Sequence, residues 1–161
     1  MNQELTLRPV TEEDIPLLYQ LITELAEYEK MADVVYGTAE DLRRSIFERN
    51  AARALIAYAG EEVAGMSVWC YNFSTFECKP GLYLEDLFIR PAFRRRGYGD
   101  RILRHLAALA VEEDCARMEW SVLNWNDPAI RFYNAIGATP VDGWTVYRLT
   151  GDALISVAKG K

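Results

Sequence analysis

Residues 94–100 read Arg94-Arg95-Arg96-Gly97-Tyr98-Gly99-Asp100, and this is the most informative stretch of the sequence. It follows an apolar run that ends at Ile89 and precedes apolar residues at helical spacing that begin with Ile102. Two glycines permit a tight turn at a helix start, where free N–H groups and the helix dipole favour an anion. Three arginines add positive charge at the same place. The stretch therefore predicts a binding site for a pyrophosphate.

Two other phosphate-binding loops are excluded by the same residues. A dinucleotide-binding loop needs G-x-G-x-x-G directly after the first strand, and a P-loop needs Gly-Lys followed by Ser or Thr. Neither pattern is present in this chain. The remaining alternative is a glycine-containing turn whose arginines are simply solvated.

On either side of this stretch, the alternation of apolar and polar residues predicts strands, and apolar residues three or four positions apart predict helices. We expect strands at 5–9, 54–59, 63–71, 82–89, 117–123 and 144–149, and helices at 12–28, 39–48, 99–114 and 127–136. Early hairpins followed by strand-helix-strand units predict an α/β (α+β) fold with one mixed sheet and helices on its faces. We expect a single domain over residues 1–161, with a core from about 5 to 150 and a polar tail.

Composition narrows the function classes. The formal charge of −6 disfavours nucleic acid as a partner and mildly favours a cationic substrate. Three cysteines without a C-x-x-C pair, and a single histidine, argue against a disulfide framework and against a metal site. No leader-like segment and no apolar run of about 20 residues is visible, so we expect a cytoplasmic protein without membrane association.

The spacing Arg94-x-x-Gly97-x-Gly99 resembles the acetyl-CoA pyrophosphate loop of the GNAT superfamily of N-acetyltransferases. Further segments resemble its spermidine/spermine (diamine) acetyltransferase branch, namely residues 25–29, 82–89, 124–126, 132–133 and 143–144. The resemblance implies a GNAT-like, mostly antiparallel twisted sheet with a splayed parallel pair. It also implies acetyl-CoA as the cofactor, a homodimer, and acetyl transfer to a primary amine of a polyamine or diamine by direct attack.

Two residues are the candidate catalytic groups. An alkyl ammonium with a pKa near about 10.4 keeps its proton at neutral pH, so the reaction needs a base. Glu85 is the candidate, because strand alternation directs Glu85 and Asp86 to opposite faces and leaves one carboxylate for a cleft. Tyr133 is, by resemblance, the acid that protonates the leaving thiolate. A solvent-facing or ion-paired Glu85 and a core Tyr133 are the structural alternatives.

The resemblance also implies which residues bind the two substrates. The expected coenzyme-binding residues are Leu87, Phe88, Ile89, Arg94, Arg95, Arg96, Gly97, Tyr98, Gly99, Asp100, Asn126, Asp127, Pro128, Ala129 and Tyr133. The expected amine-binding residues are Tyr28, Glu29, Glu85 and Asp142. In the family the strand over residues 84–89 carries a bulge, which the sequence alone does not show.

One departure from the family and two functional alternatives accompany this assignment. Asp100 stands where the family has a small residue, and its charge repels phosphate, an effect that Arg95 and Arg96 would offset. The sole histidine, His105, is expected on the helix surface. The alternatives are an acetyltransferase for thialysine or another small amine, and a non-catalytic module that binds acyl-CoA.

Overall fold

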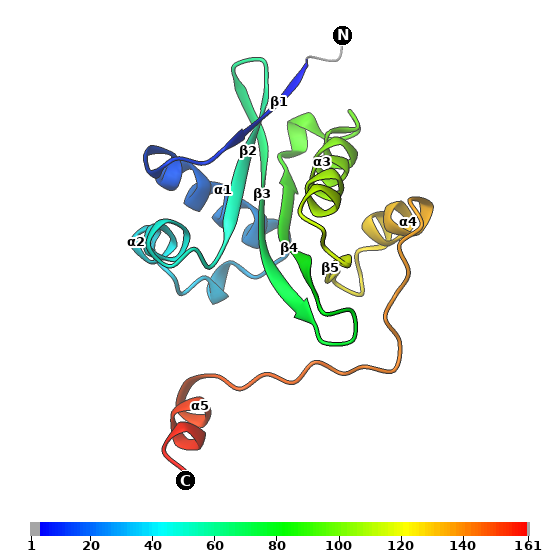
Figure 1. Cartoon of the computed structure of the whole chain (residues 1–161). Coiled ribbons are helices and arrows are strands. Elements are labelled where there is room, and N and C mark those ends of the chain that lie inside the picture. Colours follow the sequence, from blue (N-terminus) through cyan, green and yellow to red (C-terminus); the bar gives the residue numbers. More distant parts are fainter. Residues whose placement is uncertain (1–3, 161) are drawn as a thin grey trace. The chain divides into compact units, whose positions relative to one another are not determined.

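The structure is a computed structural model that describes residues 4–160 (Figure 1). It consists of two compact units, Met1–Ser121 and Val122–Lys161. The first unit contains the sheet and most of the buried residues. The second contains two helices joined by a long irregular segment.

The first unit is built on a five-stranded sheet with the strand order β1-β2-β3-β4-β5. The strands are β1 (Leu5–Pro9), β2 (Arg53–Ala59), β3 (Glu62–Ser74), β4 (Lys79–Ile89) and β5 (Arg117–Trp120). Neighbouring strands are antiparallel from β1 to β4, whereas β4 and β5 are parallel. Helix α3 (Tyr98–Glu112) makes the crossover that a parallel pair requires. The predicted mixed sheet is therefore confirmed.

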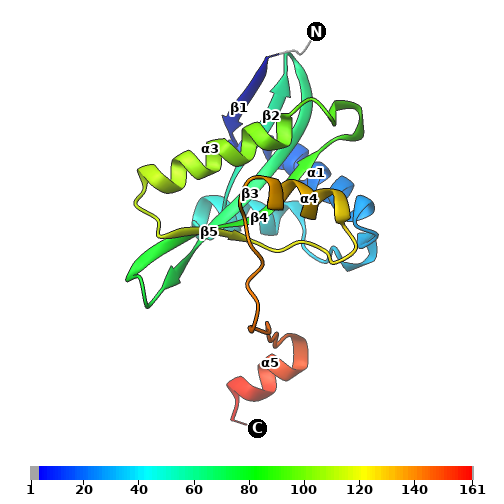
Figure 2. The same cartoon turned by 90° about the vertical axis from the view of Figure 1, so that its right-hand side faces the viewer.

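Helices cover both faces of this sheet. Helices α1 (Ile15–Tyr28) and α2 (Ala39–Arg43) lie on one face, and α3 lies on the other (Figure 1). Figure 2 shows α3 crossing in front of the strands. A short helical turn at Glu12–Asp14 precedes α1, and another at Arg44–Glu48 follows α2. Together with these turns, the two helices confirm the predicted spans of 12–28 and 39–48. Further short turns occur at Ala32–Val34 and Pro91–Phe93.

The core between α1 and the sheet explains why α1 forms where it does. Its buried residues recur at helical spacing, and they pack with Ile56, Met66, Val68 and Phe88 of the sheet. Phe88 is only 4% exposed, so β4 is fixed on this face by ordinary apolar packing. Side chains two residues from Phe88 along the strand consequently also face α1.

Strand β4 is irregular at Glu85. Leu84 pairs with Trp69 and Asp86 pairs with Val68, so Glu85 is an extra residue that has no partner of its own on β3. The pairing of β4 with β5 runs only from Gly81 to Leu84. Within the described residues, β4 beyond Leu84 therefore has no strand on its β5 side. The bulge and the parallel pair agree with the family resemblance, and the pairing of β4 with β5 ends where β5 ends, at Trp120.

The second unit agrees with the prediction in part. Helix α4 (Asp127–Ala135) forms as expected, with the Asn126 side chain accepting a hydrogen bond from the Ala129 N–H at 3.4 Å. The predicted strand at 144–149 is wrong, because residues 138–150 form neither helix nor strand. The alternation there suits a strand, but a strand forms only beside a partner edge. The tail expected after it contains helix α5 (Gly151–Ala158).

Candidate active site

The start of α3 has the open form that an anion needs. Gly97 precedes the helix with φ of 76°, a left-handed conformation that glycine adopts without strain, and no side chain caps the helix there. Gly99 lies against Leu87, whose Cδ2 atom would be 3.7 Å from a Cβ at that position. The first turn of α3 therefore presents backbone N–H groups beside β4, and its geometry fits a pyrophosphate.

The three arginines before this helix do different things. Arg94 Nε donates to the Ile89 carbonyl at 2.9 Å, and Arg96 Nη2 donates to the Ala92 carbonyl at 3.0 Å. Both side chains therefore brace the loop. Arg95 is exposed and has a φ of 62°, a conformation that costs a residue with a side chain about 1–2 kcal/mol.

Asp100 has its own counter-ion. Arg104 lies one helical turn further along α3, and its Nε is 2.7 Å from Asp100 Oδ2. The sequence-based expectation that Arg95 and Arg96 offset the charge of Asp100 therefore overlooked the nearest cation. Spacing of four residues on a helix was the signal for this pair.

Arg94 joins the loop to the end of α1. Its guanidinium carbon lies 4.3 Å from the centre of the Tyr28 ring and 5.8 Å from the centre of the Phe88 ring. Both distances fall within the range of a cation–π interaction, which is about 6 Å. The predicted coenzyme loop and the predicted amine-binding residue Tyr28 thus meet in one place.

Two other carboxylates lie close enough to Asp86 of β4 to change its pKa. Burial, followed by the negative charges of Glu85 and Glu29, raises the pKa of Asp86 to about 6. Burial also raises the pKa of Glu29, which directly follows α1. Glu85 additionally raises the pKa of the Cys70 thiol, although burial of Cys70 contributes more. The predicted residues Glu29 and Glu85 therefore each lie close enough to Asp86 to repel its negative charge.

Asp86 is the site residue that sequence reasoning missed. Regular alternation would direct it away from Glu85, but the bulge interrupts the alternation. Asp86 is opposite Val68 and two residues from Phe88, and both of those side chains belong to the core under α1. The available signal was a pair of adjacent acids inside an apolar strand, where a charge is costly and so tends to have a function.

The remaining predicted site residues belong to the second unit. Asn126, Asp127, Pro128 and Ala129 form the start of α4, and Asn126 serves there as the helix cap. The Tyr133 ring packs against the Phe132 ring, with their centres 5.6 Å apart. Asp142 lies in a turn of the irregular segment. Their roles in binding and catalysis stay predictions.

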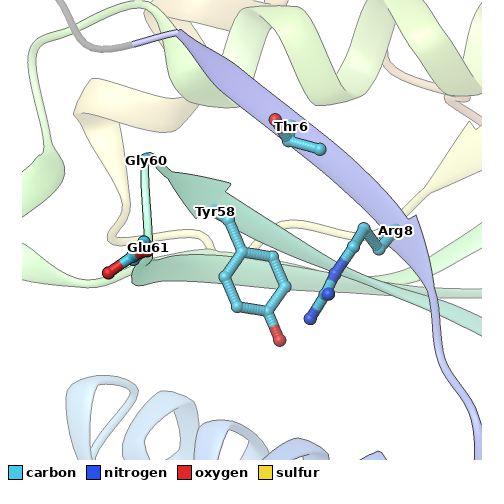
Figure 3. A pocket seen from close by; sticks show the side chains of 5 residues that line it. All are labelled: Thr6, Arg8, Tyr58, Gly60 and Glu61. Carbon is cyan, nitrogen blue, oxygen red and sulfur yellow. The ribbon is translucent and has the colours of Figure 1, made fainter.

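A separate hollow lies at the edge of the sheet. It has a volume of about 330 Å³ and is lined by Thr6, Arg8, Tyr58, Gly60 and Glu61 (Figure 3). The Arg8 guanidinium lies over the Tyr58 ring at 4.0 Å from its centre. None of the predicted site residues lines this hollow.

Within residues 4–160, no helix is long enough and apolar enough to cross a bilayer.

The comparison with protein families identifies the family of the chain. The model of the acetyltransferase (GNAT) family matches residues 17–138, a span that holds the α3 loop, the bulged strand and α4. The fold and the loop thus define an acyl-transferring enzyme. The chain belongs to the GNAT family of acetyltransferases.

Individual relatives indicate which kind of acetyltransferase the chain resembles. A thialysine N-epsilon-acetyltransferase of Caenorhabditis elegans is 42% identical over 148 residues, covering 90% of this chain and 91% of that protein. A human spermidine/spermine N(1)-acetyltransferase-like protein 1 is 31% identical, covering 90% of this chain and 22% of that protein. A solved integron cassette protein of V. cholerae has a TM-score of 0.80, 25% identity and 99% coverage of both chains. The chain is an acetyl-CoA-dependent N-acetyltransferase, and its relatives agree with the diamine acetyltransferase branch.

Proposed function

We propose that this enzyme transfers the acetyl group of acetyl-CoA to a primary amine of a diamine or polyamine. The observation that carries the proposal is the group of three carboxylates, Glu29, Glu85 and Asp86, beside the part of β4 that has no partner on its β5 side. A substrate with several ammonium groups needs several negative charges, and Tyr28 adds an aromatic ring at the edge of this group.

The coenzyme is proposed to bind along β4 and the start of α3. Backbone groups of Leu87, Phe88 and Ile89 line the edge of β4 that β5 leaves free, which suits an extended pantetheine arm. Gly97 and Gly99 open the helix start to the pyrophosphate. Acetyl-CoA supplies the activated thioester, and the exposed Arg95 supplies further positive charge for its phosphates.

The proposed chemistry is direct attack of the amine, without a covalent intermediate on the enzyme. A carboxylate of the group on β4, predicted from the sequence to be Glu85, takes the proton of the substrate ammonium directly or through water. The neutral amine then forms its bond to the acetyl carbon as the carbon–sulfur bond breaks. Tyr133 is proposed to give its phenolic proton to the departing thiolate.

The second candidate substrate is thialysine or another small amine. It is favoured by the relative from Caenorhabditis elegans, whose name is that of a thialysine acetyltransferase. Thialysine differs from a polyamine because it carries a carboxylate beside its α-amino group. Two substrate classes, both with a primary amine at the end of a flexible chain, therefore compete for the same proposed site.

A panel of amines distinguishes these candidates. Thiol release from acetyl-CoA is followed with spermidine, spermine, putrescine, thialysine, lysine and ornithine, each over a range of concentrations. The protein has three free cysteines of its own, so each rate is measured against a mixture without amine. Mass spectrometry then identifies the acetylated product.

The outcomes separate the proposals. We expect release of thiol with spermidine or a short diamine, and the larger kcat/KM defines the substrate. A larger kcat/KM with thialysine assigns the enzyme to the second candidate. Binding of acetyl-CoA without turnover of any amine would show that the chain is an acyl-CoA-binding module and would refute the proposal.

A homodimer is the proposed assembly, as the family resemblance implies. In the second unit, residues 144–149 expose large apolar side chains, with Trp144 79%, Val146 87% and Tyr147 93% exposed. Such surfaces mark sites of association. Light scattering should give twice the chain mass of 18.4 kDa, and Val146→Lys should lower it. The mass of a single chain for the unaltered protein would rule the homodimer out.

The cytoplasm is the proposed location. Cys70, Cys78 and Cys115 are all free thiols, which suits a reducing compartment. Trapping of free thiols in freshly lysed cells tests this. Full labelling of the three cysteines is expected, whereas oxidised cysteines would favour another compartment.

A further inference from the structure

Arg90 is the residue at which the chain leaves β4 for the proposed coenzyme loop. Its backbone N–H donates to the Ala64 carbonyl at 2.9 Å, a hydrogen bond that continues the pairing of β4 with β3. Its own carbonyl accepts the Phe93 N–H at 2.9 Å, which forms the turn at Pro91–Phe93. The direction in which the chain enters the loop therefore depends on how Arg90 is held.

The side chain of Arg90 is anchored to α1 by two parallel hydrogen bonds. Its Nε donates to Glu24 Oε2 at 2.8 Å, and its Nη2 donates to Glu24 Oε1 at 2.7 Å. The Gln20 side-chain amide donates to the same carboxylate at 2.9 Å, and Arg90 Nη1 donates to the Val63 carbonyl at 3.3 Å. Such a two-pronged contact fixes the orientation of both groups as well as their distance. Both side chains are partly buried, so dissolved salt screens the pair less than it screens a surface pair.

A second contact lies one turn further along the same helix. Glu24 and Tyr28 are four residues apart in α1, so their side chains lie on one face of the helix. The Tyr28 ring carries the Arg94 guanidinium at 4.3 Å from its centre. Arg90 and Arg94 thus contact two successive turns of α1. The proposed coenzyme loop is therefore tied to this helix at two points, and one of them is an ion pair.

We infer that Arg90 and Glu24 are positioning residues, and that through their ion pair α1 fixes the place of the coenzyme loop. The inference rests on the proposed function, because it concerns the acetyl-CoA and amine sites of that proposal. Tyr28 and Glu29, two of the proposed amine-binding residues, lie at the end of α1, one turn beyond Glu24. A displacement of α1 would therefore disturb both proposed binding sites together.

The opposing explanation is that the pair serves only the stability of the fold. Breaking such a pair would lower the melting temperature and leave the affinity of the folded protein for acetyl-CoA unchanged. Breaking a pair that positions the loop lowers this affinity even in a protein that is as stable as before. Replacing both charged side chains with apolar ones distinguishes the two cases, because it is often neutral for stability and yet removes the oriented hydrogen bonds.

The test measures acetyl-CoA binding by calorimetry in Arg90→Met, in Arg90→Lys and in the double variant Glu24→Leu with Arg90→Met. Arg43→Met is the matched control, because Arg43 also makes two hydrogen bonds to one carboxylate, that of Glu40, but does so within α2. The melting temperature of each protein is recorded alongside. Calorimetry needs neither amine nor turnover, so the result does not depend on which amine is the substrate.

Arg90→Met is expected to weaken acetyl-CoA binding about 3- to 10-fold, and also to lower the melting temperature because Glu24 is left partly buried without its cation. The double variant should regain most of the melting temperature and keep the weak binding. Arg90→Lys retains the charge without the parallel hydrogen bonds, so its affinity should fall between those of Arg90→Met and the unaltered protein. Arg43→Met should leave the affinity unchanged.

The amine should report the same displacement of α1. At saturating acetyl-CoA, the double variant should raise the KM for the best amine of the panel about 3- to 10-fold. Its kcat should stay within about 2-fold of the unaltered enzyme, because the pair orients binding elements and supplies no proton to the reaction. A loss of stability alone lowers the amount of folded enzyme and does not change KM.

Other results overturn the inference. Normal acetyl-CoA affinity in a folded double variant would show that the pair serves only the fold, and the proposed acetyl transfer would stand. An equal loss of affinity in Arg43→Met would also contradict the inference, because any broken ion pair would then have the same effect. If Arg90→Met or the double variant does not fold, the affinity of Arg90→Lys decides by the same criterion. An unaltered protein that binds no acetyl-CoA would instead refute the proposed function, and the inference would fall with it.

Discussion

The guanidinium of Arg94 lies 4.3 Å from the centre of the Tyr28 ring. Arg94 belongs to the loop proposed to hold the coenzyme, whereas Tyr28 ends α1, where the proposed amine site begins. The same guanidinium donates through Nε to the carbonyl of Ile89 at the end of β4. One side chain thus contacts the three elements that border the proposed site, and the proposed coenzyme loop is joined to the proposed amine site.

Replacing Tyr28 should therefore affect the coenzyme as well as the amine. A cation–π contact is worth about 0.5–1 kcal/mol at an exposed site, so Tyr28→Leu should weaken acetyl-CoA binding about 2- to 5-fold. Tyr28→Phe keeps the ring and should leave the affinity unchanged. Tyr36→Leu, at a tyrosine that is 85% exposed, is the control. Calorimetry with acetyl-CoA measures the effect, and equal affinity in all three variants would confine Tyr28 to the amine.

Gly97 should not tolerate a side chain. Its φ of 76° lies in the left-handed region, where a β-branched residue is strained although no atom lies within 4 Å of the added Cβ. We expect Gly97→Val to weaken acetyl-CoA binding about 5- to 30-fold, the equivalent of about 1–2 kcal/mol of backbone strain. Gly37→Val is the matched control, since Gly37 has equal space and an ordinary φ. Equal affinity in both variants would mean that the loop does not hold the coenzyme.

Most of the fold was predictable because its signals are local. The strand alternation, the helical spacing of α1 and the glycines before α3 each specify one element from nearby residues. The predicted strand at 144–149 failed for a physical reason. Its alternation is compatible with a strand, but pairing depends on a partner edge that the segment itself does not specify.

The site was predictable to a smaller extent. The α3 loop could be located because glycines and arginines have few alternative uses at a helix start. Asp86 could not be distinguished from Glu85, because the bulge arises from the pairing of β3 with β4. The Arg94–Tyr28 contact joins residues that are far apart in sequence, and no local pattern indicates it.

Tyr133 should prove necessary for turnover and unnecessary for binding. If its phenolic proton goes to the departing thiolate, Tyr133→Phe should lower kcat about 10²-fold or more, since that is the usual contribution of a general acid. The ring is retained, so its packing on Phe132 and the affinity for acetyl-CoA should not change. Tyr147→Phe, at a tyrosine that is 93% exposed, is the control. A Tyr133→Phe enzyme with normal kcat would remove the phenol from the mechanism.

The ionised carboxylate of Asp86 should make the folded protein less stable at neutral pH than a neutral side chain at that position would. The pKa of Asp86 is raised to about 6 on folding, so its ionisation favours the unfolded chain. The sign follows directly, because stability is highest when the carboxyl is protonated and falls as the pH rises from about 4 to 6. The full effect is on the order of 3 kcal/mol.

Asp86→Asn should therefore raise the melting temperature by several degrees at pH 8 and hardly at all at pH 4, while Glu62→Gln, at an exposed carboxylate of β3, should change the melting temperature at neither pH. A gain of the same size at both pH values would mean that the substitution acts through packing, and a loss at pH 8 would mean that ionised Asp86 is stabilised by a partner.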